Sequence, residues 1–158
     1  MQVERYERYW MWAATGMLVL FTGAIVATAL AGSVHPPSHV ETVDPETLTV
    51  TGEFVSPGVM TAPDGRITVV MRAEFYVFRP TVVRIPAGRR VRFRITSPDV
   101  LHGFQIVGTN VNLTVAPGYV SEVTTTFDTP GEYLVVCNEY CGLAHHLMQG
   151  TVIVEAAP

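Results

Sequence analysis

The N-terminal part of the chain carries a long apolar run. No aspartate, glutamate, lysine or arginine lies between Trp10 and Val40, and residues 11–31 are nearly all apolar or small. A helix rises about 1.5 Å per residue, so this run can cross the roughly 30 Å hydrocarbon core of a bilayer. Aromatic residues precede it, as is typical of a membrane–water interface: Tyr6, Tyr9, Trp10 and Trp12. We predict a short N-terminal tip and a transmembrane helix within residues 1–32.

The residues before the run orient this helix. A cleaved signal peptide would open on a short positive region, whereas here Glu4 and Glu7 are mixed with Arg5 and Arg8. We therefore favour a retained anchor. Because the next basic residue is Arg66, the positive-inside rule predicts a cytoplasmic N-terminus and a C-terminal domain outside the membrane.

The rest of the chain has the pattern of an all-β domain. Residues 33–45 form a linker that contains prolines, and residues 46–158 form a domain in which β-rich runs are separated by glycine and proline breaks. The predicted strands are 66–72, 73–78, 81–85, 89–96, 104–107, 111–115, 120–127, 132–136 and 151–155. Short strands at regular spacing are typical of an all-β sandwich or barrel.

Residues 89–96 show the clearest alternation. Arg90, Arg92 and Arg94 alternate with apolar residues, so a strand here would have one basic and one apolar face. The basic face fits either a solvated edge strand or a docking surface for acidic groups of a partner.

Composition narrows the function classes. The net charge of −4 argues against nucleic-acid binding. The chain has only two cysteines, Cys137 and Cys141, whereas a disulfide scaffold would have more of them, scattered along the chain. Two close cysteines in a small domain indicate a redox pair or metal ligands.

Metal-binding side chains are concentrated near the C-terminus. Cys137, Cys141, His145 and Met148 lie close together in sequence, and His102 ends an upstream Ser-Pro-Asp-Val-Leu-His segment. Sulfur and imidazole ligands together select copper or zinc over hard ions. A mononuclear blue-copper site needs a single cysteine, so the second one is in excess. Two thiolates on one loop can bridge two metal ions, with one histidine capping each ion and weak ligands from Met148 and a loop carbonyl.

The residues alone leave alternatives open. A structural zinc site fits the cysteine spacing but leaves Met148 unused. A disulfide between Cys137 and Cys141 is allowed outside the cell. His146 is a second candidate for the place of His145.

The pattern C-x-E-x-C-G-x-x-H-x-x-M, preceded by S-x-D-V-x-H, resembles the binuclear copper-A motif of cytochrome c oxidase subunit II. The single helix resembles the B-family (ba3-type) haem–copper oxidases. The resemblance implies a cupredoxin-like Greek-key β-sandwich. The copper ligands it implies are His102, Cys137, the Glu139 main-chain oxygen, Cys141, His145 and Met148.

The resemblance also implies a role and partners. Electrons would come from a soluble cytochrome c or a small copper protein. They would pass to the haem of subunit I, which reduces oxygen to water while protons are pumped, in a prokaryotic plasma membrane. Many relatives also bind magnesium at the subunit I boundary through the side chain at the position of Glu139, and a carboxylate suits that hard ion.

Two departures and two rival functions accompany this resemblance. Mitochondrial-type relatives have two helices and a Trp-centred motif, whereas here the corresponding region contains Tyr76 and Phe78, our candidates for the residues that receive electrons. The same copper-A domain also fits a nitric or nitrous oxide reductase. A membrane-anchored copper-delivery protein is the other rival, but its thioredoxin-like fold needs a βαβ alternation that this sequence lacks.

Overall fold

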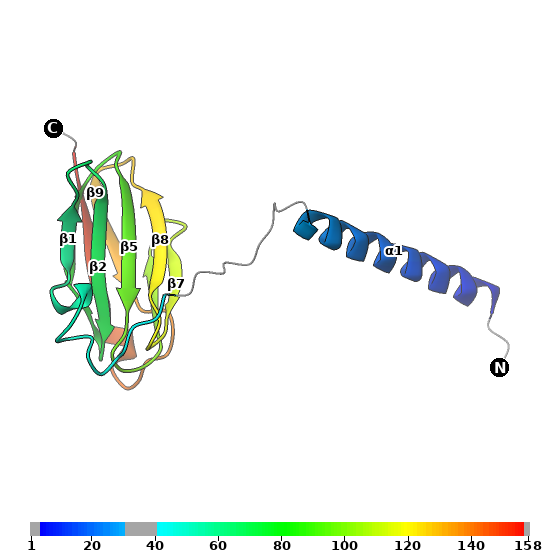
Figure 1. Ribbon diagram of the computed structural model, residues 1–158, viewed down its shortest axis with the longest axis horizontal. Coiled ribbons are helices and arrows are strands. Elements are labelled where there is room, and N and C mark those ends of the chain that lie inside the picture. Colours follow the sequence, from blue (N-terminus) through cyan, green and yellow to red (C-terminus); the bar gives the residue numbers. More distant parts are fainter. Residues whose placement is uncertain (1–3, 31–40, 157–158) are drawn as a thin grey trace. The chain divides into compact units, whose positions relative to one another are not determined.

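The chain forms two compact units, Met1–His39 and Val40–Pro158. The structure, a computed structural model, describes residues 4–30 and 41–156 (Figure 1). Most of the predicted linker, residues 33–40, lies outside the described residues.

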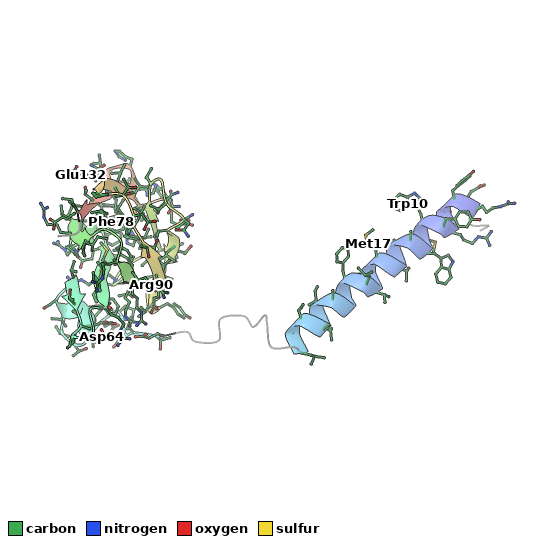
Figure 2. The ribbon with its side chains drawn as sticks, turned by 90° about the horizontal axis from the view of Figure 1, so that it is seen from above. Trp10, Met17, Asp64, Phe78, Arg90 and Glu132 are labelled. Carbon is green, nitrogen blue, oxygen red and sulfur yellow. The ribbon has the colours of Figure 1, made fainter. Side chains whose placement is uncertain are left out.

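The first unit contains the helix α1, Arg5–Leu30, which has a mean hydropathy of 2.0 over its most apolar window. Its 26 residues span about 39 Å, enough to cross the hydrocarbon core. None of its side chains is buried by the protein, and Figure 2 shows Trp10 and Met17 projecting outward from it. An exposed apolar surface on all sides is typical of a helix whose neighbours are lipid or other membrane helices.

The second unit is a β-sandwich of two five-stranded sheets (Figure 1). One sheet has the order β1-β2-β5-β8, with β3 paired to β2, and the other has the order β4-β10-β9-β6-β7. The strands of the first sheet are β1 Gly58–Thr61, β2 Ile67–Glu74, β3 Val77–Arg79, β5 Arg90–Thr96 and β8 Ser121–Thr126. Those of the second are β4 Val82–Pro86, β6 His102–Ile106, β7 Asn112–Val115, β9 Gly131–Val136 and β10 Gln149–Glu155. The predicted all-β fold is confirmed.

Two strand predictions differ from the structure. The strand β1 was not predicted; it is only four residues long and mostly exposed, so it shows no alternation of buried and exposed positions. The strand predicted over 73–78 is instead a turn at Phe75 and Tyr76 between β2 and β3. Tyr76 has a φ of 67°, a left-handed conformation that a β-propensity pattern does not reveal.

The core lies between the two sheets and consists of inward-facing side chains from alternate strand positions. Phe78, Phe93 and Phe104 are its largest members, and all three are completely buried. The ring centroid of Phe104 lies 5.5 Å from that of Phe78 and 5.9 Å from that of Phe93. This packed centre holds the two sheets together.

Residues 41–56, which we call the strap, cover part of the outer face of the β1-β2-β5-β8 sheet. Leu48 and Phe54 of the strap pack on Val70 of β2. Arg72, also on β2, donates to the Phe54 carbonyl oxygen at 2.6 Å. The strap thus gives this sheet a small second core.

The interpretation of 89–96 as a solvated edge strand is wrong. β5 is an inner strand between β2 and β8, and the side chain of Arg94 is 9% exposed. Its guanidinium bonds Glu41 at 2.6 Å and Glu53 at 2.5 Å, both on the strap, and Glu122 at 3.0 Å. Carboxylates of the same chain therefore occupy this part of the basic face.

Candidate metal centre

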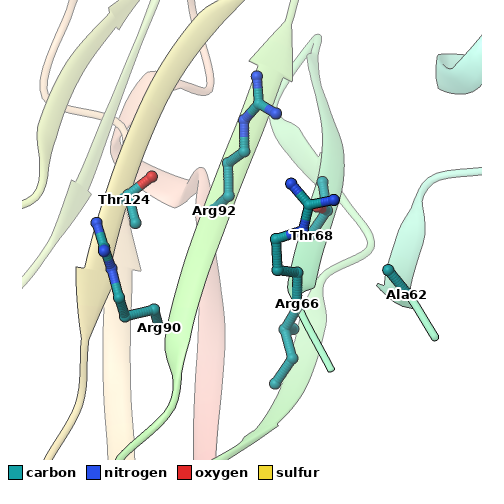
Figure 3. Close-up of a pocket in the computed structure, with 7 residues that line it drawn as sticks. Ala62, Arg66, Thr68, Arg90, Arg92 and Thr124 are labelled. Carbon is teal, nitrogen blue, oxygen red and sulfur yellow. The ribbon is translucent and has the colours of Figure 1, made fainter. Parts of the chain in front are cut away.

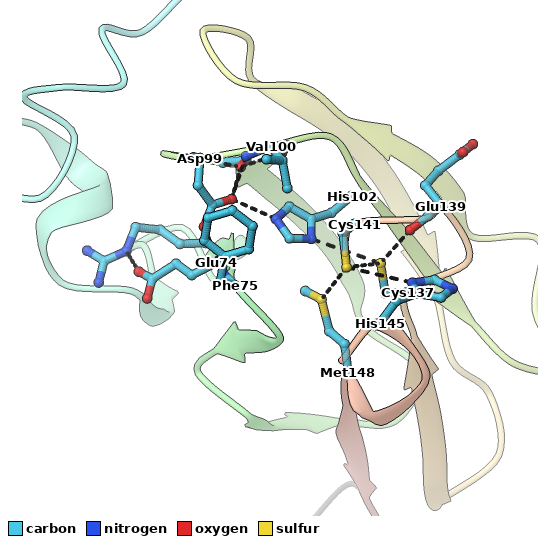
Figure 4. Close-up of polar contacts among 12 residues, drawn as sticks. Glu74, Phe75, Asp99, Val100, His102, Cys137, Glu139, Cys141, His145 and Met148 are labelled. Atoms are coloured by element: carbon cyan, nitrogen blue, oxygen red, sulfur yellow. Dashed lines mark hydrogen bonds and ion pairs between the residues drawn. The ribbon is translucent and has the colours of Figure 1, made fainter. Parts of the chain in front are cut away.

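Two loops at one end of the sandwich bring the predicted ligands together (Figure 4). His102 is the first residue of β6, after the loop that leaves β5. Cys137 directly follows β9, and Met148 directly precedes β10. Because β6 and β9 are antiparallel with Gln105 opposite Val136, the start of β6 lies beside the residues that follow β9.

The sulfur atoms of the two cysteines lie at the centre of the cluster. Cys137 Sγ and Cys141 Sγ are 3.7 Å apart, and the structure shows both as free cysteines. A disulfide bond is about 2.05 Å long, so this separation does not correspond to one. It leaves room for metal ions to be shared between two sulfurs.

The other four donors surround these sulfurs. The Nδ1 atom of His102 lies 4.0 Å from Cys137 Sγ, and the Glu139 carbonyl oxygen lies 3.2 Å from the same sulfur. The Nδ1 atom of His145 and Met148 Sδ lie 3.6 Å and 3.8 Å from Cys141 Sγ. Each sulfur thus has one imidazole nitrogen and one weaker donor within reach, and all six predicted ligands converge.

Burial keeps this cluster away from solvent. His102 is completely buried, and Cys137, Cys141 and Met148 are nearly so. Burial, with the neighbouring Cys137 as the next cause, raises the pKa of the Cys141 thiol above its ordinary value. Because a cysteine binds metal as the thiolate, metal binding here must displace protons.

Asp99 holds His102 in place. Its Oδ1 atom lies 2.8 Å from His102 Nε2, and its Oδ2 atom accepts the Phe75 N–H at 2.7 Å. Burial acts to raise the pKa of Asp99, but hydrogen bonds from His102, Val100, Ser97 and Phe75 outweigh it and lower the pKa. The ionised carboxylate accepts a hydrogen bond from the Nε2–H group, which leaves the Nδ1 lone pair facing the sulfurs.

Glycine is required where β6 meets residues 137–148, which connect β9 to β10 and which we call the cysteine loop. A Cβ atom on Gly103 would lie 2.7 Å from the backbone nitrogens of both Asn138 and Glu139. The Gly103 N–H also points at Cys137 Sγ, 3.4 Å away. Because Gly103 has no side chain, the cysteine loop can pack against the strand that carries His102.

The two residues proposed to receive electrons occupy different environments. Tyr76 is partly exposed, and its hydroxyl oxygen accepts the N–H of Leu143 at 3.1 Å. A Cβ atom on Gly142 would lie 2.6 Å from that hydroxyl oxygen, so a glycine lets the ring approach the cysteine loop. Phe78 is completely buried in the core, where a protein that donates electrons cannot touch its ring.

Of the two neighbouring histidines, His145 faces the sulfurs, whereas His146 is exposed.

The sequence did not identify several other residues that shape this centre. The roles of Asp99, Gly103 and Gly142 were missed, although Asp99 and Gly142 fall inside the quoted motif. The exposed Phe75, whose N–H bonds Asp99, was missed as well.

Comparison with known proteins identifies the family. A family model described as "Cytochrome C oxidase subunit II, periplasmic domain" matches residues 66–157. Cytochrome c oxidase subunit 2 of Thermus thermophilus is 42% identical over 156 residues, which cover 95% of this chain and 92% of that protein. The chain belongs to the cytochrome c oxidase subunit II family.

Solved structures agree. A chain in the structure of a haem–copper terminal oxidase dimer is 32% identical to this subunit II, with a TM-score of 0.62. That match covers 96% of this chain and all of the other. The periplasmic domain of subunit II of cytochrome oxidase from Bradyrhizobium japonicum is 17% identical, with a TM-score of 0.51 over 56% of this chain and 83% of that one, which shows the fold alone.

These findings confirm the predicted family and its cupredoxin-like fold. This subunit II is a membrane-anchored component of a haem–copper cytochrome c oxidase complex, and it therefore has partner subunits. The family implies copper binding, and the residues present fit copper because two thiols, two imidazoles and a thioether form a soft donor set.

Proposed function

We propose that this subunit II receives single electrons at a centre of two copper ions and passes them to a haem of subunit I. Cys137 and Cys141 would bridge the ions, His102 and His145 would cap one each, and Met148 and the Glu139 carbonyl would be weak axial ligands. Thiolates shared between two ions would let one unpaired electron spread over both, so that little rearrangement accompanies electron transfer. The oxygen chemistry and proton pumping would belong to the partner subunit.

The observation that carries this proposal is the distribution of donors about the two sulfurs. At 3.7 Å apart, both sulfurs can contact the same ions. One imidazole nitrogen approaches each sulfur, at 4.0 Å from Cys137 and 3.6 Å from Cys141. A tetrahedral zinc site would use two cysteines and two histidines and leave the buried Met148 thioether without a role.

We place the arrival of electrons at Tyr76. Its hydroxyl accepts the Leu143 N–H, so a single hydrogen bond and the main chain of Gly142 connect it to Cys141. Exposed apolar side chains lie along the same loops: Leu101, Tyr140, Leu143 and Leu147. Such a surface suits the weak, short-lived contact of a soluble redox partner, which we take to be a cytochrome c or a small copper protein. Because Phe78 is buried, its role would be to support the β2–β3 turn.

The Glu139 side chain supports a second, finer proposal. Its carbonyl oxygen faces Cys137, whereas Figure 4 shows its carboxylate directed away from the sulfurs. A carboxylate is a preferred ligand of magnesium. We propose that it binds this ion together with oxygen ligands from subunit I.

The proposed orientation follows from charge. Arg5 and Arg8 lie at the start of α1, and no other basic residue follows until Arg66. We propose that α1 crosses the lipid of a prokaryotic plasma membrane with its N-terminus in the cytoplasm. The β-sandwich would then lie on the periplasmic or extracellular side.

Electron transfer in the purified complex tests the proposed role. Reduced cytochrome c is mixed with the oxidase, and reduction of the subunit I haem is followed by rapid absorbance measurements. Cys141→Ser should abolish this reduction, whereas His146→Gln, an exposed neighbour, should leave it intact. Equal rates in all three proteins would contradict the proposal. The large subunit that copurifies distinguishes an oxidase from a nitric or nitrous oxide reductase.

A further inference from the structure

A hollow lies on the outer face of the β1-β2-β5-β8 sheet, beside the part that the strap covers. Its volume is about 470 Å³, and its lining includes Ala62, Arg66, Thr68, Arg90, Arg92 and Thr124 (Figure 3). The strap packs on Val70 and Arg94, which are further along β2 and β5, and leaves this end of the face open. Sites for small molecules usually measure about 300–1,000 Å³, so the hollow has a suitable size.

Cationic side chains outnumber anionic ones in this hollow. Arg92 pairs with Glu122, and Arg66 pairs with Asp64 at 2.7 Å. Within residues 4–30 and 41–156, no carboxylate pairs with Arg90. A guanidinium has five N–H donors, and few of those on Arg66 and Arg92 are engaged by their carboxylates. The hollow therefore offers many unengaged donors, although the whole chain has a net charge of −4.

The arrangement of these donors repeats along β5. Arg90, Arg92 and Arg94 point to the same face, because side chains two apart on a strand do so. Arg94 indicates that this face binds anionic oxygens, because its guanidinium bonds carboxylate oxygens of Glu41 and Glu53 in the strap. Residues of the strap do not line the hollow at Arg90 and Arg92, and Thr68 and Thr124 line it instead.

Guanidinium forks and hydroxyl groups together are typical ligands of phosphate oxygens. We propose that this hollow binds a phosphate-bearing anion, with Arg90 and Arg92 bonding the phosphate oxygens and Thr68 and Thr124 donating from the sides. The volume exceeds that of a single phosphate ion and fits a diphosphate or a phosphate ester. Arg90 begins β5 and the loop to His102 leaves its other end, so this site is separate from the metal centre and independent of the proposed function.

Calorimetric titration of the full-length chain in detergent tests this site, with pyrophosphate as the probe at low salt. The wild type should bind one equivalent. Arg90→Gln removes a guanidinium that has no carboxylate partner in the described part of the chain, and it should weaken binding by about tenfold or more. The control is Arg84→Gln, because Arg84 is an exposed arginine paired with Glu155 on the other sheet, and it should not change binding.

The remaining results decide the ligand class. Tighter binding of glycerol phosphate than of pyrophosphate would support the phosphate site and assign it to a lipid headgroup. Tighter binding of pyrophosphate would support the site and assign it to a free phosphate compound. Equal binding of citrate, with equal weakening in Arg84→Gln and Arg90→Gln, would overturn the proposal in favour of general attraction of anions. Absence of pyrophosphate and glycerol phosphate binding would overturn it too. Unchanged thermal unfolding of Arg90→Gln shows that its fold is retained.

Discussion

Asp99 and His102 are joined by a hydrogen bond of 2.8 Å between a carboxylate oxygen and the imidazole nitrogen that faces away from the cysteines. The same carboxylate accepts the Phe75 N–H at 2.7 Å. One side chain thus connects the β2–β3 turn, whose aromatic residues are at the surface, to a buried imidazole of the metal centre. This link fixes which nitrogen of His102 can act as a ligand.

Replacing Asp99 should therefore weaken copper binding. Asp99→Ala removes the acceptor of the hydrogen bond from the His102 Nε2–H and should lower copper affinity by about 10–100-fold. Asp99→Asn should have a smaller effect, because its side-chain carbonyl oxygen can still accept that hydrogen bond. Competition with a chelator measures the affinity. Asp128→Asn, in the β8–β9 connection, is the matched control. Unchanged affinity in Asp99→Ala would show that His102 is positioned by packing alone.

Gly103→Ala should damage the centre without touching a ligand. The new Cβ atom would lie 2.7 Å from the backbone nitrogens of Asn138 and Glu139, so the cysteine loop must move. We expect reduced copper content and a loss of about 1–3 kcal/mol in the free energy of unfolding. Gly58→Ala is the control, because its Cβ atom would meet open space. Metal analysis and thermal unfolding of both variants measure the difference, and full copper loading of Gly103→Ala would refute this account.

The local part of the centre could be predicted from the sequence, since Cys137, Cys141, His145 and Met148 share one short loop. His102 was chosen as a donor for its residue type and the family resemblance supported that choice, but its position beside the cysteines depends on the pairing of β6 with β9, which the chain pattern does not give. The contacts of Asp99 with Phe75 and of Gly103 with Asn138 join segments far apart in sequence. Such contacts depend on tertiary packing and leave no periodic signal.

The fold shows the same division. The alternation over 89–96 located β5, but it did not reveal that the strap supplies carboxylates to Arg94, because Glu53 and Arg94 are 41 positions apart in the sequence. The β2–β3 turn was read as continuous strand, since Phe75 and Tyr76 have high β-propensity. Phe75 and Tyr76 form a two-residue loop between antiparallel strands paired at Glu74 and Val77, and such loops favour a positive φ like that of Tyr76.

Arg94→Met should destabilise the β-sandwich unit. Removing the buried guanidinium leaves Glu41, Glu53 and Glu122 without their shared cation, at a cost of about 1–3 kcal/mol in the free energy of unfolding. Arg84→Met breaks only an exposed pair with Glu155 and should cost less than about 1 kcal/mol. Chemical denaturation of both variants makes the comparison, and equal losses would mean that burial of Arg94 adds nothing.

The same network should respond to acid. The Arg94 hydrogen bond lowers the pKa of Glu41, and the Arg92 hydrogen bond lowers the pKa of Glu122. A carboxylate whose folded-state pKa is lowered adds stability above its ordinary pKa of 4.5, and this stability is lost as the pH falls below that value. The difference in unfolding free energy between the wild type and Arg94→Met should therefore be constant near neutral pH and shrink below about pH 4.5. A difference that grows in acid would contradict this reading.

Tyr76→Phe and Phe78→Leu should separate electron transfer from stability. Tyr76→Phe keeps the ring but removes the acceptor of the Leu143 N–H, so electron arrival from reduced cytochrome c should slow several-fold with little change in stability. Phe78→Leu leaves a smaller side chain in the core and should cost about 1–3 kcal/mol while the rate is retained. Stopped-flow absorbance and thermal unfolding give the two quantities. The opposite pattern would move electron arrival away from Tyr76.

The central claim is that Cys137 and Cys141 together hold two copper ions. Metal analysis of the purified oxidase, with the copper of the other subunits subtracted, combined with electron paramagnetic resonance of the oxidised centre, tests this claim most directly. We predict two coppers per subunit II and a hyperfine pattern shared equally by both nuclei. One copper with a pattern from a single nucleus, or a disulfide between the two cysteines in the fully loaded complex, would contradict it.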